Sequence, residues 1–182
     1  ESLNGLLPPR LVLGGATRRE SVLNGLKHIM QDGGAARVLI HDAARPFLSH
    51  EVISSLITAL DVAPGAVPAL AVVDSLARGE ESLASTVERE HLWRIQTPQA
   101  FHFDAIYQAH RDWSGDEPSD DARMLMAPGQ EVRIVAGDER LSKYTFASDF
   151  AESDHMPQIR SGSGFDVHRL VVRSAQGQGS RL

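Results

Sequence analysis

Apolar and polar positions along this chain follow the order strand, helix, strand, helix, strand up to Val73. The run Arg37–Ile40 is continuously apolar after its first residue, which is typical of a strand covered on both faces. Apolar residues three and four apart predict helices after two capping residues, Thr17 and Ser49. Two further short apolar runs predict strands at Leu11–Leu13 and Ala66–Val73. This order predicts an α/β fold with a mostly parallel sheet.

Residues 74–96 interrupt this rhythm with turn residues and short strand-like pieces at Ser85–Arg89 and Leu92–Gln96. They predict a hairpin arm that projects from the main sheet. Beyond the arm, the pattern predicts a helix at Phe103–Arg111, a second helix that ends at Met126 and a third that begins after Ser148. It also predicts strands at Val132–Ala136 and Lys143–Phe146.

Composition narrows the classes of function. The formal net charge of -6 disfavours nucleic acid or an anionic membrane as a partner. No cysteine is present, which excludes disulfides, thiolate catalysis and cysteine zinc sites. Because no apolar run is long enough to span a bilayer and no signal peptide is visible, we expect a cytoplasmic protein.

The strand Arg37–Ile40 runs directly into Asp42 and Arg45. In α/β enzymes, functional groups lie at the carboxyl ends of strands, so these two residues are candidates for a site. The alternative is that Asp42 caps a turn and Arg45 pairs with a nearby acid. The pattern alone leaves these two interpretations equally open.

Other candidates have weaker support from pattern alone. Gly15, with Arg18 and Ser21 after it, could bring backbone N–H groups to an anion, although a plain strand–turn–helix connection is favoured. Ser119-Asp120-Asp121 fits a helix start, and Lys143 fits a solvated strand residue. Asp166 and His168 share one face of an expected strand and could bind one metal ion, but such a pair is common by chance.

Six segments together resemble the 2-C-methyl-D-erythritol 4-phosphate cytidylyltransferases of the non-mevalonate isoprenoid pathway. They are GGATRRESVLNGL, VLIHDAARP, GAVPALAVVDS, TVEREHLWRIQTPQAF, SDDA and EVRIVAGDERLSK, between Leu11 and Glu152. A seventh, SGSGFDVHRL, resembles the first strand of 2-C-methyl-D-erythritol 2,4-cyclodiphosphate synthase, which is fused to the first enzyme in some bacteria.

The resemblance implies a Rossmann-like, three-layer nucleotidyltransferase sheet with an arm for dimerisation. It implies cytidylyl transfer from CTP to 2-C-methyl-D-erythritol 4-phosphate, with Mg²⁺ as the cofactor and pyrophosphate as the second product. It also implies three domain ranges: a cytidylyltransferase domain at 1–152, a linker at 153–160 and an incomplete cyclodiphosphate synthase domain at 161–182.

The resemblance assigns roles to individual residues. Catalysis would fall to Asp42, Arg45 and Lys143, with Asp42 also binding Mg²⁺. The remaining assignments are Gly15, Arg18, Ser21 and Ala43 for the nucleotide, Ser75, Arg89, Thr97 and Ser119 for the methylerythritol phosphate, and Asp166 with His168 for an incomplete Zn²⁺ site. The arm carrying Arg89 and Thr97 would cross to the partner subunit.

The chain departs from the family pattern in its first ten residues. Nothing in Glu1–Arg10 matches the glycine-rich loop that wraps the triphosphate, so we expect the 182 residues alone to turn over poorly. The missing loop leaves open an inactive remnant that only dimerises or binds ligand. Because the arm residues choose the substrate, a related cytidylyltransferase for another alcohol phosphate, such as ribitol 5-phosphate, is a second alternative.

Overall fold

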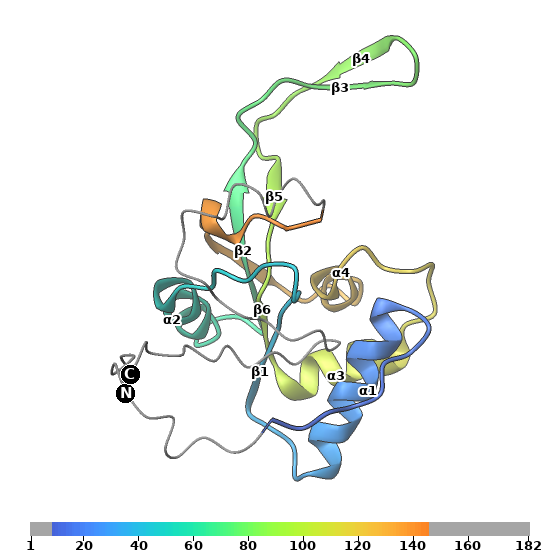
Figure 1. Cartoon of the computed structure of the whole chain (residues 1–182), viewed down its shortest axis with the longest axis vertical. Helices are drawn as coiled ribbons and strands as arrows, with labels where there is room; N and C mark the ends of the chain where they lie inside the picture. Colours follow the sequence, from blue (N-terminus) through green and yellow to red (C-terminus); the bar gives the residue numbers. More distant parts are fainter. Residues whose placement is uncertain (1–8, 146–182) are drawn as a thin grey trace, which may run out of the picture.

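The computed structural model describes residues 9–145, which form an α/β unit with a projecting arm (Figure 1). The helices are α1 (Arg18–Gln31), α2 (His50–Ala59), α3 (Phe103–Asp112) and α4 (Asp121–Met126), with a short 3-10 turn at Glu139–Leu141. The strands are β1 (Arg37–Ile40), β2 (Gly65–Ala71), β3 (Leu76–Gly79), β4 (Leu83–Val87), β5 (Trp93–Ile95), β6 (Gln99–His102) and β7 (Val132–Ala136).

The main sheet is built around β2. One edge of β2 pairs with β6 and then β5, both antiparallel, while β7 pairs with its other edge in parallel. Strand β1 pairs antiparallel with β6, so β1, β2 and β7 all run in one direction. The predicted α/β class is confirmed, but the described sheet is mixed rather than mostly parallel because β6 lies between β1 and β2.

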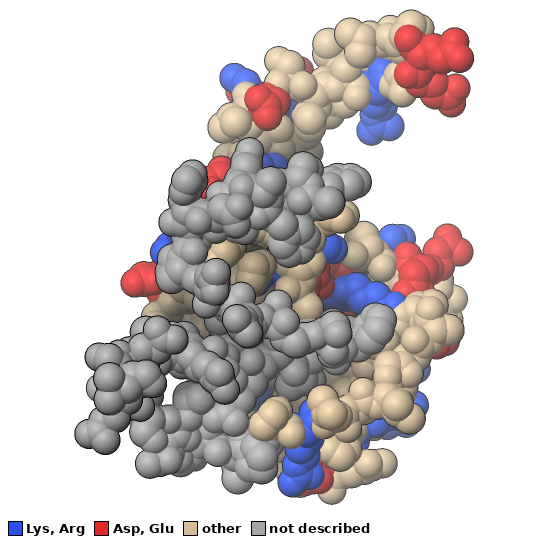
Figure 2. Space-filling model, viewed as in Figure 1, with Lys and Arg blue, Asp and Glu red and all other residues tan. Residues whose placement is uncertain are grey.

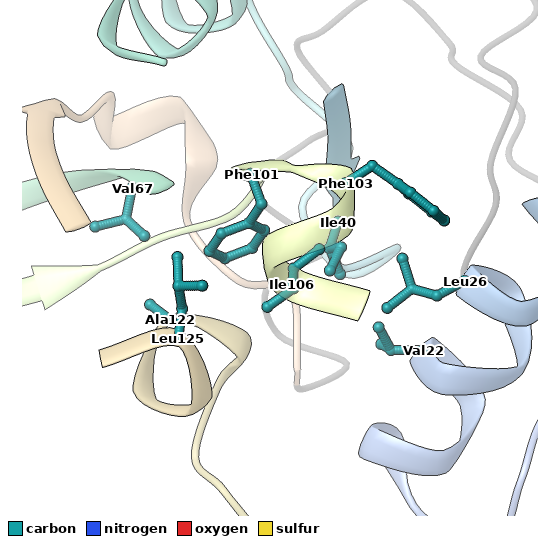
Figure 3. Packing of buried hydrophobic residues seen from close by; sticks show 9 residues of the cluster. All are labelled: Val22, Leu26, Ile40, Val67, Phe101, Phe103, Ile106, Ala122 and Leu125. Atoms are coloured by element: carbon teal, nitrogen blue, oxygen red, sulfur yellow. The ribbon is translucent and has the colours of Figure 1, made fainter. Parts of the chain in front are cut away.

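Two apolar clusters cover the two faces of this sheet. Alternate residues of β6 point to opposite faces, so Ala100 packs with α2 whereas Phe101 packs with α1, α3 and α4. Figure 3 shows the cluster around Phe101, in which Phe101 and Ile106 are fully buried. The predicted three-layer arrangement is thereby confirmed.

The arm is the antiparallel hairpin β3–β4, and it extends away from the rest of the molecule (Figure 1). Almost all of its residues are exposed, and Glu80 and Glu81 lie in the turn at its tip. The predicted hairpin is confirmed, but Leu92–Gln96 does not belong to it. That segment contains β5, which pairs with β2 in the main sheet.

Three other expectations need correction. Leu11–Leu13 is not a strand, and neither are residues 143–145. The latter instead contact the loop after β1 through a hydrogen bond from Tyr144 N–H to Ala44 O. Strand β6 was not predicted, because four residues between Pro98 and a helix are too few to show a period. The helix predicted after Ser148 lies outside the described residues. Within residues 9–145, no helix is long and apolar enough to cross a membrane.

Candidate active site

Asp42 follows the carboxyl end of β1, where its carboxylate lies between two cations. Arg18 Nε, at the start of α1, is 3.3 Å from Asp42 Oδ1. Lys143 Nζ, which comes 101 residues later in the chain, is 3.3 Å from Asp42 Oδ2. The structure therefore brings together three candidates from distant segments, and Lys143 is not simply solvated. The same face of the molecule carries Lys and Arg side chains near α4 and the start of α1 (Figure 2).

The charge on Arg18 is held by two carboxylates. Burial opposes the charge, but Asp121 and, after it, Asp42 outweigh that penalty and raise the pKa of the guanidinium above its ordinary value. Arg45 differs, because burial lowers its pKa and the charge of Asp42 offsets only part of this effect. Its guanidinium donates to Leu141 O, while its buried Nε has no hydrogen-bond partner among the described residues.

A buried pair stands behind Arg18. Asp121 Oδ2 lies 2.8 Å from Arg18 Nη2, and Asp121 Oδ1 lies 2.9 Å from His110 Nε2. Burial alone would raise the pKa of Asp121, but the hydrogen bond from His110 and the charge of Arg18 lower it below its ordinary value. The predicted helix start is confirmed, since Asp120 caps α4. Asp121, the first residue of α4, instead pairs with Arg18, which also contacts Asp42.

Thr97 supports the loop that carries Asp42. Its side chain is buried, and its Oγ1 accepts a hydrogen bond from Asp42 N–H at 3.0 Å. Thr97 Oγ1 also lies 3.2 Å from His41 Nδ1, while His41 Nε2 lies 2.9 Å from Arg45 O. The expectation that Thr97 lies on the arm is wrong, because it follows β5 in the main sheet.

The Gly14-Gly15 turn leads into α1 as predicted. Gly15 N–H donates to Ser21 Oγ at 3.0 Å, and Ala16 N–H donates to Glu20 Oε2 at 2.7 Å. A Cβ added to Gly15 would lie 2.2 Å from Glu20 Cβ, so the turn requires glycine there. In this structure the backbone donors are satisfied within the chain, which leaves their role toward an anion a prediction.

None of the other candidates among residues 9–145 has a side-chain contact with Asp42 in the hydrogen bonds and ion pairs described above. Ser75 and Arg89 flank the base of the arm, where Arg89 donates to Val73 O. Ser119 is exposed before α4, and Ala43 is exposed next to Asp42. Asp166, His168 and the boundaries at 152, 160 and 161 lie outside the described residues, so the Zn²⁺ site and the domain division remain predictions.

The described residues fit a magnesium site only in a limited sense. No group of three or more His, Asp or Glu side chains within residues 9–145 could hold a metal ion. Asp42 offers one carboxylate at the end of β1. One or two carboxylates plus substrate phosphates form the usual binding mode of Mg²⁺ in nucleotide sites, and Asp42 fits that mode.

Comparison with known proteins decides the family. Residues 2–157 match the family described as 2-C-methyl-D-erythritol 4-phosphate cytidylyltransferase, IspD. The chain belongs to the IspD family. The predicted family and its nucleotidyltransferase class are therefore confirmed.

Curated relatives of this IspD-family chain are bifunctional. The Bifunctional enzyme IspD/IspF of Novosphingobium aromaticivorans is 52% identical over 173 residues, which cover 94% of this chain and 45% of the relative. That of Caulobacter vibrioides is 48% identical over 174 residues, covering 92% of this chain and 45% of the relative. The chain thus spans less than half the length of these relatives.

Solved structures support the same fold. The 2-C-methyl-D-erythritol 4-phosphate cytidylyltransferase of Thermus thermophilus is 34% identical with a TM-score of 0.70, and the match covers 83% of this chain and 77% of that chain. The bifunctional IspDF of Campylobacter jejuni is 27% identical with a TM-score of 0.68, and the match covers 86% of this chain and 45% of that chain.

The sequence did not single out three polar residues around the candidate site. His41 contacts the side chain of Thr97, and Gln96 donates to the backbone oxygen of Asp138. His110 contacts the carboxylate of Asp121. A signal existed for His110, because it shares one face of α3 with the buried residues Phe103 and Ile106. A histidine on the apolar face of a helix requires a buried partner.

Proposed function

We propose that this protein transfers a cytidylyl group from CTP to 2-C-methyl-D-erythritol 4-phosphate. A phosphate oxygen of the acceptor forms a bond to the α-phosphorus of CTP. The bond from that phosphorus to the bridging oxygen breaks, and pyrophosphate leaves with the electron pair. Membership of the IspD family supports this activity, and the arrangement of Asp42 with Arg18 and Lys143 is the observation that carries it.

The reaction brings the negatively charged phosphates of CTP and the acceptor together, and cationic side chains of the site can balance that charge. Phosphoryl transfer depends on positioning and charge stabilisation rather than on a covalent intermediate. Lys143 is half exposed beside Asp42, so its ammonium can turn toward a phosphate oxygen. Arg45 contributes a buried Nε that has no partner among the described residues, which favours an anionic acceptor beside it.

The nucleotide and the acceptor would occupy the two sides of Asp42. The turn at Gly15, with Arg18, Ser21 and Ala43, would line the cytidine side. On the acceptor side, Ser75 and Ser119 would supply hydroxyl donors for the methylerythritol phosphate, and Arg89 of a second copy would supply a guanidinium. Thr97 acts beneath the site, where it fixes the backbone of Asp42.

Asp42 would hold Mg²⁺ together with the phosphates of CTP. When bound, the ion neutralises charge on the transferring phosphates. The carboxylate now pairs with Arg18 and Lys143, and Arg18 keeps a second partner in Asp121 when Asp42 changes partner. The site can therefore exchange a cation at Asp42 without leaving Arg18 unpaired.

The arm would join two copies of the chain. Leu83 on β4 is 83% exposed and Leu76 on β3 is 37% exposed, and exposed leucines on a projecting hairpin favour a protein partner. A second copy would bring its own Arg89 toward the acceptor side of the first. The active unit is then a homodimer.

Incubation of CTP, Mg²⁺ and 2-C-methyl-D-erythritol 4-phosphate with the natural gene product that contains these residues tests the activity. Phosphorus NMR should show a diphosphate diester and pyrophosphate appearing in equal amounts. Ribitol 5-phosphate as the acceptor provides the comparison, since faster turnover with it would assign the protein to another alcohol phosphate. Absence of product with both acceptors would contradict cytidylyl transfer.

A further inference from the structure

A line of buried contacts leads from α3 through α4 to the site. It runs from His110 to Asp121, from Asp121 to Arg18, and from Arg18 to Asp42. We propose that Asp121 is a positioning residue that directs the Arg18 guanidinium at Asp42, and that His110 holds Asp121 in place. The inference rests on the proposed function for its activity readout only.

The Arg18 guanidinium lies between two carboxylates, and its contact with Asp121 is an ion pair, since Asp121 Oδ2 has no hydrogen bond of acceptable geometry among the described residues. Arg18 Nη2 is 2.8 Å from Asp121 Oδ2, while its Nε, on the same planar group, is 3.3 Å from Asp42 Oδ1. The side chain of Asp121 is fully buried, whereas one third of the Arg18 side chain is exposed. A long cationic side chain loses rotamer freedom when it is ordered, so a fixed carboxylate behind it prepares the guanidinium before any substrate binds.

His110 completes the support. Its side chain is fully buried, and its Nδ1 has no hydrogen-bond partner among the described residues. Its Nε2 lies 2.9 Å from Asp121 Oδ1, and an ionised carboxylate oxygen only accepts, so the tautomer with the proton on Nε2 fits this contact. That tautomer donates to Asp121 Oδ1 and leaves the negative charge of the carboxylate to Arg18.

Asp121 is not needed to begin α4. Asp120 caps the helix by accepting from Arg123 N–H at 2.9 Å, and Ala122 N–H donates to Gln99 Oε1 at 3.0 Å. The α4 N-terminus is thus held by Asp120 and Gln99. The buried carboxylate has its partners in His110 and Arg18, which makes orientation of the arginine its function.

A double-mutant cycle separates positioning from general support of the fold. We expect Asp121→Asn to lower kcat about 10-fold or more for cytidylyl transfer, because Arg18 loses its direction. The same change in an Arg18→Ala background should lower kcat by less than about 2-fold, since the group that Asp121 directs is gone. Equal effects in both backgrounds would overturn the proposal.

Variants of His110 provide a second test if Asp121→Asn fails to fold. His110→Gln keeps a side-chain N–H donor and should stay within about 3-fold of the parent kcat, whereas His110→Leu removes the donor and should lose about 10-fold. Leu56→Ala, in the opposite apolar cluster, controls for lost stability and should leave kcat unchanged. Equal kcat values for the two His110 variants would contradict the proposal.

A spectroscopic readout separates this proposal from the proposed function. In the ligand-free protein, the Arg18 Nε–H signal in ¹⁵N NMR should exchange slowly with water, and Asp121→Asn should speed that exchange at least about 10-fold. Slow exchange that survives the substitution would overturn the positioning role. A protein that shows the exchange effect but no transfer would keep the positioning role and lose the proposed activity.

Discussion

Thr97 Oγ1 accepts a hydrogen bond from the backbone N–H of Asp42 at 3.0 Å, across 55 positions of sequence. This contact joins the turn between β5 and β6 to the end of β1. It fixes the main chain that carries the site carboxylate, so the position of Asp42 depends on the core of the sheet.

Thr97→Val should destabilise the fold. The substitution keeps the side-chain shape but removes the buried acceptor of the Asp42 N–H, which costs about 1–3 kcal/mol in the free energy of unfolding. Urea unfolding measures it as a lower midpoint. Thr97→Ser retains the hydroxyl and is the control, and equal midpoints for the Val and Ser variants would show that the hydrogen bond contributes nothing.

The sequence predicted the elements whose apolar residues form a clear pattern, either a continuous run or a helical period. The strand Arg37–Ile40 ending on Asp42 is such a case, and so is the helix over Arg18–Gln31. It could not predict that Lys143 meets Asp42, because the contact depends on how β7 packs beside β2 and on the 3-10 turn that follows it. Strand β6 was missed because its four residues lie between Pro98 and α3 and show no clear apolar pattern. Without β6, the sequence could not predict the antiparallel pairings that make the sheet mixed.

Gly137→Ala should destabilise the protein through a clash with backbone. A Cβ at Gly137 would lie 2.5 Å from Gln96 Oε1 and 2.9 Å from Ala69 O, and the backbone atom cannot move away. We expect a loss of about 1–3 kcal/mol, measured by urea unfolding. Gly25→Ala is the matched control, since nothing lies within 4 Å of its Cβ and a helix gains up to about 1 kcal/mol from alanine.

Stability should fall in acid partly through Asp121. Because its pKa in the folded state lies below the ordinary value of 3.8, the unfolded state binds the proton more tightly. The contribution is complete above about pH 5 and is lost as the pH falls through the folded pKa. Asp121→Asn should therefore reduce the slope of unfolding free energy against pH below about pH 4.

The control for this acid titration is Asp61→Asn, which removes an exposed carboxylate paired with Arg37. It should leave the slope close to that of the parent protein. If the Asp121→Asn variant shows the same slope of unfolding free energy against pH as the parent protein, other carboxyl groups account for the acid sensitivity.

Leu83→Glu should weaken the dimer that the arm is proposed to form. A charge at this exposed leucine would have to be buried or moved aside in the interface, and this cost favours the monomer. Sedimentation velocity should show the parent at twice the chain mass and the variant shifted toward one chain. Val62→Glu, at an exposed position in the turn after α2, should leave the parent distribution unchanged. A parent that sediments as a monomer would contradict the proposed homodimer.

Asp42→Asn tests the central claim most directly. The substitution preserves the size of the side chain but removes the charge that meets Arg18, Lys143 and the proposed Mg²⁺. Cytidylyl transfer from CTP should fall at least about 100-fold. The free energy of unfolding, measured in the same buffer, should change by less than about 1 kcal/mol, because Arg18 retains Asp121. Unchanged transfer, or a loss of transfer matched by a loss of folded protein, would contradict a catalytic site at the end of β1.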